Sequence, residues 1–356
     1  MPIRVVHIGT GNVGRLALAG LITDPRFEVV GVCVSSAEKV GRDAGELAGL
    51  DVSTGVRATD SLDAVLALAP DCAVYCAMGD TRPLEALDDC RSILAAGVDL
   101  VGSAPGMLQY PWQVLPDKYF APIEDAARAS GKSVFVTGID PGFANDLIPL
   151  AFSGTCRDIE QIRCSEIADY ATYDGATVMF DVMGFGKPLD EVPMLLQPGV
   201  LRLAWGTTIR QLAAGLDVTV DEITESYERE PAPETFEIAA GQVPKGSVAA
   251  IRFEIQGRVQ GRPLIVIEHT TRLREDLRPD WPRPAQPGGS YRVEIVGEPS
   301  YTVDICPTSR HGDHNHAAIV AAAGRIVNAI PAVVAAPPGI RTSLDLPLIA
   351  GTVLPH

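Results

Sequence analysis

The sequence lacks an excess of basic residues and lacks any long uninterrupted run of apolar residues. Its 356 residues include 29 lysines and arginines against 45 acidic residues, which gives a formal charge of −16 at pH 7. Such an acidic chain is poorly suited to nucleic acid or to an anionic membrane, so we expect neither as a partner. The longest apolar stretch, residues 317–336, is interrupted by Arg325, Asn328 and Pro331, and we predict that it does not span a membrane.

Closely spaced cysteine pairs and an N-terminal signal peptide are also missing. The seven cysteines are odd in number and form no Cys-x-x-Cys motif. Four of them lie in apolar, strand-like runs and are predicted to be reduced core residues: Cys33, Cys72, Cys76 and Cys164. Because a predicted strand begins almost at the first residue, nothing there resembles a signal peptide. We therefore expect a cytoplasmic globular protein, and its length favours two domains.

A glycine-rich turn stands between the first predicted strand and the first predicted helix. Residues 4–14 read Arg-Val-Val-His-Ile-Gly-Thr-Gly-Asn-Val-Gly, and an apolar helical pattern follows. In this Gly-x-Gly-x-x-Gly arrangement Gly9 permits the tight turn, Gly11 lets the backbone approach a pyrophosphate, and Gly14 lets the helix pack closely on the strand. The helix N-terminus then offers free N–H groups to the phosphates. The turn predicts a dinucleotide site.

The end of the second predicted strand, residues 27–34, bears on which dinucleotide is bound. An NAD site usually has Asp or Glu at this place to accept hydrogen bonds from the ribose hydroxyls. Here the strand runs into Ser35 and Ser36, with Lys39 and Arg42 beyond, which suits a ribose 2′-phosphate. The two cations can equally be ordinary solvated charges on the next helix. We predict NADP as the cofactor, with NAD possible.

The predicted cofactor site combines the glycine-rich turn, the end of the second strand and the loop after the third. Its residues are Gly9, Thr10, Gly11, Asn12, Val13, Gly14, Ser35, Ser36, Lys39, Arg42, Met78 and Gly79.

Two different patterns of secondary structure follow along the chain. Up to about residue 150, continuous apolar strands alternate with helices, which indicates a doubly wound, parallel Rossmann sheet covered on both faces. From 151 to 311, alternating strands joined by hairpins indicate an α+β domain with a largely antiparallel sheet for substrate binding and dimerisation. We expect a C-terminal helix and tail, 312–356, to complete the first domain. A helix is also predicted over 172–183.

Four segments in order resemble the dihydrodipicolinate reductase-like superfamily. They are residues 9–14, 38–45, 140–146 and 327–331. Within the superfamily the chain is most similar to the 2,4-diaminopentanoate dehydrogenases and the native amine dehydrogenases. The resemblance implies NAD(P)H-dependent reduction of a C=O or C=N carbon by a homodimer formed through the second sheet.

One stretch departs from the pattern of these relatives. The amine dehydrogenases of this group carry a catalytic glutamate in a Glu-Glu-Leu-Ser-Tyr-Pro-like stretch. The matching residues 104–111 read Ala-Pro-Gly-Met-Leu-Gln-Tyr-Pro, with Gly106 and Met107 at the acidic positions. The Lys and paired His elements of true dihydrodipicolinate reductases are not recognisable either. A base that activates ammonia must therefore come from elsewhere in the chain.

Three residues are candidates for proton transfer. Asp140 ends a predicted strand, where low-dielectric surroundings can make it an acid, although Asp-Pro-Gly is also ordinary turn chemistry. Tyr173, near Tyr170, can donate to a carbonyl oxygen or simply pack as an aromatic ring. His314, among the histidines of 311–316, can be a proton donor, a structural residue or a metal ligand; the spacing fits no familiar zinc pattern, and no metal is predicted.

The sequence thus predicts an NAD(P)-dependent oxidoreductase that reduces a small carbonyl or imine, with ammonia as a second substrate if it acts by reductive amination. Two alternatives stay open. One is a carbonyl reductase that does not use ammonia, and the other is a catalytically silent NADP-binding sensor.

Overall fold

A computed structural model describes residues 1–79 and 81–353. The chain divides into two compact units, one formed by residues 1–139 and 319–356 and the other by residues 140–318. The first unit is built on a parallel sheet of six strands in the order β14-β5-β4-β3-β1-β2. These strands are β1 (Ile3–Ile8), β2 (Phe27–Cys33), β3 (Cys72–Tyr75), β4 (Asp99–Gly102), β5 (Ser133–Val136) and β14 (Gly339–Arg341).

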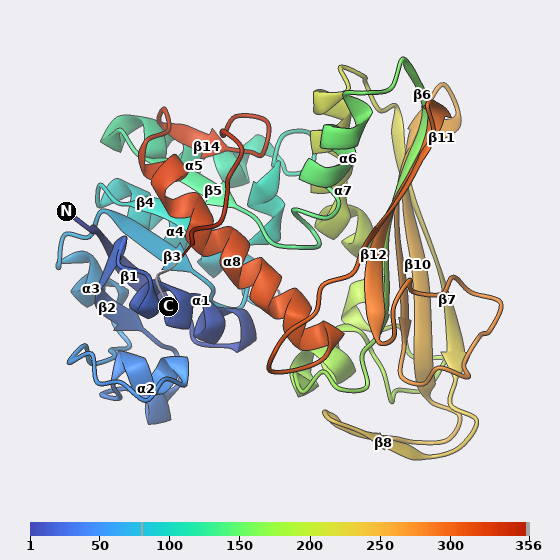
Figure 1. The fold of residues 1–356 in the computed structure, drawn as a ribbon, viewed down its shortest axis with the longest axis horizontal. Coiled ribbons are helices and arrows are strands. Elements are labelled where there is room, and N and C mark those ends of the chain that lie inside the picture. The colour runs from blue at the N-terminus through green and yellow to red at the C-terminus, as the bar shows by residue number, and fades with distance from the viewer. Residues whose placement is uncertain (80, 354–356) are drawn as a thin grey trace. The chain divides into compact units, whose positions relative to one another are not determined.

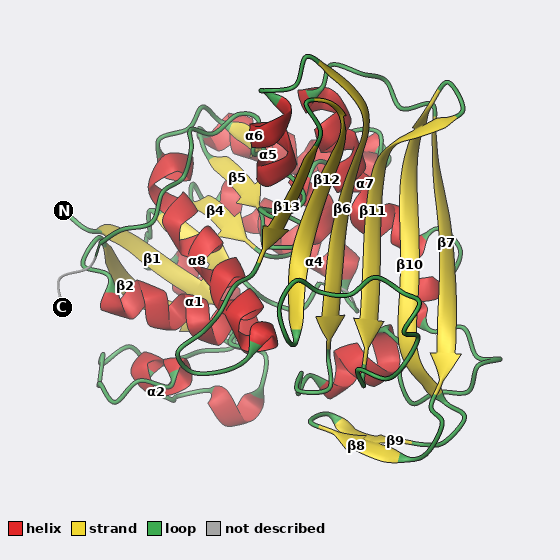
Figure 2. Ribbon diagram, turned by 45° about the vertical axis from the view of Figure 1, so that its right-hand side comes forward, coloured by secondary structure: helices red, strands yellow, loops and turns green. Residues whose placement is uncertain are grey.

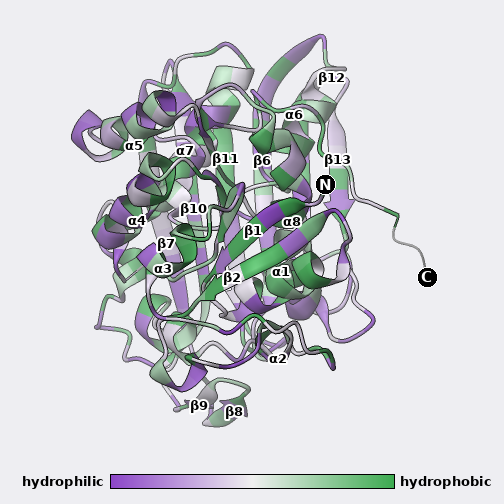
Figure 3. Ribbon diagram, turned by 90° about the vertical axis from the view of Figure 1, so that its left-hand side faces the viewer, coloured by the Kyte–Doolittle hydropathy of each residue, from purple (hydrophilic) through white to green (hydrophobic). Residues whose placement is uncertain are grey.

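Helices cover both faces of this sheet, and the strand residues alternate between them. Val5, Val74 and Phe135 pack with α1 and α8 on one face, whereas Val6 and Leu100 pack with α4 and α5 on the other. Figure 1 shows α1 and α8 beside the sheet, and Figure 3 shows β1 and β2 largely in the hydrophobic colour. The helices are α1 (Asn12–Thr23), α2 (Ala44–Ala48), α3 (Leu62–Leu66), α4 (Pro83–Ala95), α5 (Asp117–Ser130) and α8 (His314–Val334). The predicted Rossmann sheet is confirmed.

The second unit is built on a six-stranded mixed sheet with the order β13-β12-β6-β11-β10-β7. Only β6 and β11 pair in parallel; the other neighbours are antiparallel, as predicted. Figure 2 shows the long strands side by side. They are β6 (Asp158–Asp169), β7 (Glu222–Pro231), β10 (Val248–Val259), β11 (Arg262–Arg272), β12 (Gly289–Glu298) and β13 (Tyr301–Ile305). The remaining elements are α6 (Leu147–Ser153), α7 (Val200–Gly215) and a hairpin of β8 (Phe236–Ile238) and β9 (Gly241–Val243).

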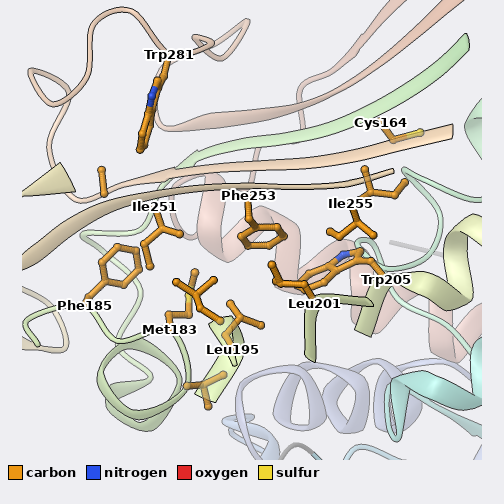
Figure 4. Packing of buried hydrophobic residues seen from close by; sticks show 14 of the residues in the cluster. Cys164, Met183, Phe185, Leu195, Leu201, Trp205, Ile251, Phe253, Ile255 and Trp281 are labelled. Atoms are coloured by element: carbon orange, nitrogen blue, oxygen red, sulfur yellow. The ribbon is translucent and has the colours of Figure 1, made fainter. Parts of the chain in front are cut away.

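The two faces of this second sheet differ in chemistry. One face is apolar and packs against α7 through Leu201, Trp205 and Ile209, and Figure 4 shows Trp205 close to Phe253 of β10. The other face carries a ladder of charged side chains, in which Arg163 pairs with Glu254 and Glu268, and Arg252 also pairs with Glu268. Polar side chains on the first face are therefore surrounded by hydrocarbon.

Three elements differ from the sequence prediction. The helix predicted over 172–183 is reduced to a π-helical turn, Thr177–Val182, because Asp169 and Thr172 are held in a non-helical turn by the amide of Asn315. The C-terminal tail contributes the edge strand β14. Helix α8 runs unbroken through Arg325, Asn328 and Pro331; it is long and apolar enough to pass for a membrane span, but half of that stretch is buried within the chain.

Candidate active site

The turn between β1 and α1 has the geometry that its three glycines require. Gly9 adopts a φ of +89°, and a Cβ there would lie 2.5 Å from the backbone nitrogen of Ala77. A Cβ on Gly14 would lie 2.0 Å from the carbonyl oxygen of Gly9, whereas a Cβ on Gly11 would meet nothing within 4 Å. Gly9 and Gly14 therefore close the turn, and Gly11 leaves open space at the start of α1 where a phosphate can approach.

Charge and hydrogen bonding around this turn also suit a dinucleotide. The first turn of α1 contains no acidic residue, so its N–H groups are not opposed by a carboxylate. His7 is fully buried and donates from Nε2 to the carbonyl oxygen of Gly9 at 2.8 Å. Burial lowers the pKa of His7 to about 4, so this imidazole stays neutral and fixes the shape of the turn.

Lys39 and Arg42, the two cations predicted to bind a ribose phosphate, differ in their surroundings. The Lys39 ammonium lies 3.1 Å from the carbonyl oxygen and 3.2 Å from the hydroxyl of Thr10, beside the turn. Arg42 is exposed and paired with Glu46 at 2.9 Å. Ser36 directly precedes the short helix Ala37–Lys39, and no carboxylate follows directly on β2. Lys39 is thus the cation that the structure brings to the nucleotide turn, whereas Arg42 has a partner of its own.

Asp140, the first residue of the second unit, is held by two donors. Its Oδ1 accepts from Asn145 Nδ2 at 2.5 Å and from the indole Nε1 of Trp205 at 2.9 Å. The side chain is 2% exposed. His269 Nε2 lies 3.3 Å from the same oxygen without forming a hydrogen bond, and the contact is an ion pair when the imidazole is protonated. The predicted candidate Asp140 therefore belongs to a buried polar cluster.

The centre of that cluster is a pair that the sequence analysis did not single out. Glu166 and His269 face each other in register on the parallel strands β6 and β11. His269 Nδ1 lies 3.7 Å from Glu166 Oε2, and the Tyr170 hydroxyl donates to Glu166 Oε1 at 2.6 Å. The imidazole thus stands between two carboxyl groups, Asp140 on one side and Glu166 on the other.

Burial and mutual charge shift the proton affinities within this cluster. Burial raises the pKa of Glu166 to about 7; His269 opposes that rise, and the Asp140 carboxylate adds to it. Burial alone would lower the pKa of His269, but Asp140 and Glu166 outweigh it and the pKa is raised. Burial and the adjacent Glu166 raise the pKa of the Tyr170 phenol, which keeps its proton. Glu166 therefore exchanges a proton near neutral pH, and the two carboxyl groups beside His269 favour the protonated form of its imidazole.

Aromatic rings enclose the imidazole. Phe253 stacks on His269 with centroids 4.6 Å apart and planes at 13°, and Trp205 meets it edge-on at 4.6 Å. These rings remove water from around the ionisable groups and so strengthen the interactions among them.

The same three side chains could also supply metal ligands. One atom from each of Asp140, Glu166 and His269 lies within 4.8 Å of the others. However, Asp140 Oδ1 already accepts two hydrogen bonds, and Glu166 Oε1 accepts one from Tyr170. Oxygens engaged by N–H and O–H donors are better arranged for proton transfer than for a cation.

The other two predicted candidates lie outside the carboxyl–imidazole pair. Tyr173 stacks on Tyr170 with centroids 5.8 Å apart, so it supports the phenol that contacts Glu166. His314 is buried at the start of α8 and packs against Tyr291; neither of its ring nitrogens has a hydrogen-bond partner among the described residues. Burial lowers the pKa of His314. Among the three candidates, only Asp140 lies in the buried group that it forms with Glu166 and His269, which is called the acid–base cluster below.

Glu166 and His269 could have been found from the sequence. Each is an ionisable residue on a strand face that is otherwise apolar, with Cys164 and Ala168 beside Glu166 and with Ile265 and Ile267 before His269. An ionisable group at such a position is costly unless it is paired, which makes it a candidate for function. Spacing along the chain gives no indication that the two residues meet, because 102 residues lie between them and only strand pairing brings them together.

A Rossmann sheet with a dinucleotide turn, joined to a unit with a buried acid–base cluster, defines an NAD(P)-dependent oxidoreductase. A family model described as the 2,4-diaminopentanoate dehydrogenase C-terminal domain matches residues 143–354. The chain belongs to this family of amine and 2,4-diaminopentanoate dehydrogenases.

Individual relatives agree with that assignment. An amine dehydrogenase from Streptomyces virginiae is 42% identical over 348 residues, which cover 97% of this chain and 96% of the relative. A 2,4-diaminopentanoate dehydrogenase from Acetoanaerobium sticklandii is 25% identical over 97% of this chain and 94% of its own length. The structure of an amine dehydrogenase from Mycobacterium smegmatis superposes with a TM-score of 0.78 at 24% identity, over 99% of this chain and 98% of that one, and supports the fold.

Proposed function

We propose that this protein carries out NADPH-dependent reductive amination of a small carbonyl compound, with Glu166 as the group that exchanges the proton. The observation that carries the proposal is a buried carboxyl with a pKa of about 7 in contact with His269. It supplies the acid–base group that the family's glutamate stretch lacks here, where Gly106 and Met107 occupy the acidic positions. The names of the curated relatives support an amine or carbonyl substrate.

Bound NADPH supplies the hydride, and the remaining work falls to the chain's own side chains. Protonated Glu166 can donate to the carbonyl oxygen that leaves as water when ammonia forms the imine. In its ionised form it can accept a proton from the attacking ammonia. A pKa near 7 leaves both forms populated at neutral pH, which suits a group that must act in both directions.

His269 and Asp140 restore the proton on Glu166. The imidazole contacts Glu166 through Nδ1 and Asp140 through Nε2, so it can take up a proton on one side and give one up on the other. Asp140 orients the ring and stabilises its charged form, as a carboxylate does for a catalytic histidine. Trp205 and Asn145 hold Asp140 in turn, and they are positioning residues for the histidine.

The test is turnover of NADPH against a panel of small aldehydes and ketones, with and without ammonia, in wild type and Glu166→Gln. Glutamine preserves the shape and the bond from Tyr170 but carries no transferable proton. We expect amine formation only with ammonia, and a loss of at least about 100-fold in kcat for the variant, as for removal of a general acid–base group. Asp181→Asn, outside the cluster on the turn Thr177–Val182, serves as control and is expected to leave kcat unchanged.

Each contrary result points to a named alternative. Equal rates with and without ammonia would make the protein a carbonyl reductase. Tight NADPH binding without turnover of any compound would favour a silent sensor, an idea that the missing acids at Gly106 and Met107 motivate. Unchanged kcat in Glu166→Gln would remove Glu166 from the chemistry.

Preference for NADPH over NADH is part of the proposal and rests on the absence of an acid after β2 and on Lys39 beside the turn. Ser35→Asp introduces a carboxylate that accepts from ribose hydroxyls and repels a 2′-phosphate. We expect its kcat/KM for NADPH to fall at least about tenfold while that for NADH is kept or rises. The measurement is steady-state kinetics with both cofactors, and an unchanged NADPH/NADH ratio would contradict it.

The proposal includes a cytoplasmic homodimer. The acidic charge and the absence of cysteine pairs support the compartment, and the family resemblance supports the dimer. Sedimentation of the purified protein tests the oligomeric state.

A further inference from the structure

A pocket with charged residues in its wall lies within the second unit, at the ends of β6 and β11. Its volume is about 310 Å³, at the lower end of the range for small-molecule sites. The charged residues that line it are Asp169, Arg272, Glu275 and Arg283, and residues 284–288 of a proline- and glycine-rich loop complete the wall.

This pocket belongs to the sheet face opposite the acid–base cluster. Asp169 and Arg272 are paired in register on β6 and β11, three residues beyond the pair Glu166 and His269. Side chains alternate along a strand, so an offset of three residues directs them to the other face. The pocket is therefore a different site from the one assigned to the proton chemistry.

Arg272 is a buried cation that has no carboxylate partner. It is 4% exposed, and among the described residues it forms no ion pair. Its Nε donates to the carbonyl oxygen of Leu277 and its Nη2 to that of Arg278, at 2.9 and 3.1 Å, and Nη1 donates to no described residue. Burial, with Arg283 and other arginines nearby, lowers the pKa of Arg272 to about 10. A guanidinium in these surroundings gains strongly from an anion.

A second guanidinium is available at the same wall. Arg283 is exposed and donates from Nη1 to the carbonyl oxygen of Glu275 at 2.6 Å, with no ion pair to any described carboxylate. Two arginines with free N–H groups match the two oxygens of a carboxylate, for which the guanidinium fork is well shaped.

Carboxylates lie in the same pocket without neutralising these arginines. Asp169 accepts one bond, from the backbone N–H of Ala171 at 2.8 Å. Its pKa is raised by burial and by the nearby carboxylates Glu275 and Asp313, and Arg272 only partly offsets this. No pair of opposite charges across the pocket, Arg272 or Arg283 with Asp169 or Glu275, comes within 4.0 Å in the described structure. The pocket wall therefore carries two arginines and two carboxylates that form no ion pairs with one another.

We propose that this pocket binds a small zwitterion, an aliphatic amino acid, whose carboxylate contacts Arg272 and Arg283 and whose ammonium contacts Asp169 and Glu275. Such a ligand matches both kinds of unpaired charge at once, which neither a simple anion nor a simple cation does. The competing role of Arg272 is a clamp that holds the loop around Trp281, through two carbonyls and a ring 5.9 Å away. That role uses Nε and Nη2 and leaves Nη1 and Arg283 unexplained.

The test is isothermal titration of the whole protein with β-alanine, propionate and propylamine as probes. We expect saturable binding of β-alanine, weaker binding of propionate, and none of propylamine. Arg283→Gln lies on the exposed rim and removes one of the two cations, so β-alanine should bind at least about tenfold more weakly. Arg262→Gln is the matched control, because Arg262 is exposed on the same strand as Arg272 and forms no ion pair with any described residue.

Two further variants separate this site from its alternatives. Glu166→Gln should bind β-alanine as wild type does, and Arg283→Gln should keep wild-type NADPH turnover. The proposal is overturned if no probe binds saturably, if Arg283→Gln binds as tightly as Arg262→Gln, or if Glu166→Gln abolishes binding. The last result would mean that β-alanine occupies the acid–base cluster.

Discussion

The pKa of the Glu166 carboxyl is set by its position on an apolar sheet face. The same carboxyl at the surface would be ionised at neutral pH, and its contact with an imidazole would be worth little. In the structure, burial raises its pKa to about 7, and the imidazole of His269, which Phe253 and Trp205 enclose, lies 3.7 Å away. The burial that raises the pKa of Glu166 also makes its carboxyl costly to fold in the ionised form.

That cost predicts a pH dependence of stability. The pKa of Glu166 is raised from 4.5 to about 7 on folding, so between these values the folded state binds more protons than the unfolded state. The free energy of unfolding then falls as pH rises through this window, by at most about 3 kcal/mol from this group. Urea unfolding from pH 4.5 to 8 should show that fall in wild type. In Glu166→Gln the dependence should be much shallower, and an equal slope in both proteins would contradict the assignment.

At this scale, local sequence can single out a residue that the structure then places in the cluster, while the catalytic role itself stays a prediction. Asp140 was identified because Asp-Pro-Gly ends a strand, and the structure brings it into the cluster. Glu166 and His269 were missed because their meaning depends on the register between two distant strands. His314 was selected from a histidine-rich stretch, and its position against Tyr291 leaves a catalytic role as an untested prediction.

The glycines in the turn between β1 and α1 have different roles: Gly9 is required by the fold, whereas Gly11 is expected to serve cofactor binding. Gly9→Ala places a Cβ 2.5 Å from backbone at a φ of +89°, and should destabilise the fold by about 1–3 kcal/mol. Gly11→Ala meets no protein atom within 4 Å and should change stability by less than about 0.5 kcal/mol. It should still weaken NADPH binding at least about tenfold, because the added methyl occupies the space for phosphate. Thermal unfolding and cofactor titration of both variants measure the difference, and unaltered binding in Gly11→Ala would mean that phosphate does not approach there.

Long elements carry enough pattern to be predicted from the sequence. The alternation of continuous apolar strands with helices up to about residue 150 indicated a parallel sheet covered on both faces, and the structure has that sheet. The hairpin of β8 and β9 and the edge strand β14 were not predicted, because three-residue strands carry too little pattern to be distinguished from loops. The helix expected from residue 172 was prevented by a contact with Asn315, far along the chain.

At the scale of the whole molecule, the dinucleotide turn and the acid–base cluster belong to different compact units. The dinucleotide turn belongs to the unit of residues 1–139 and 319–356, whereas Glu166, His269 and Asp140 belong to residues 140–318. Each unit has its own core, and each can respond to a ligand of its own.

Hydrogen exchange on the intact protein tests this division. Addition of NADPH should slow amide exchange in residues 9–16 and 34–42, because bound phosphate occupies the N–H groups there. Strands β10 and β11 should exchange at unchanged rates. Protection confined to the second unit would contradict the placement of the cofactor site, and Gly11→Ala with NADPH provides the control with little protection.

The path of the chain has a consequence for how damage to the gene would act. Residues 319–356 complete the first unit: Ile326 and Ile330 of α8 pack on its sheet, and β14 forms its edge. A premature stop codon near position 318 would therefore leave every residue of the acid–base cluster in place. It would nonetheless expose one face of the nucleotide-binding sheet. We therefore expect such a truncation to reduce cofactor binding and the yield of soluble protein, although the stop codon lies far downstream of the codons for Gly9, Gly11 and Gly14.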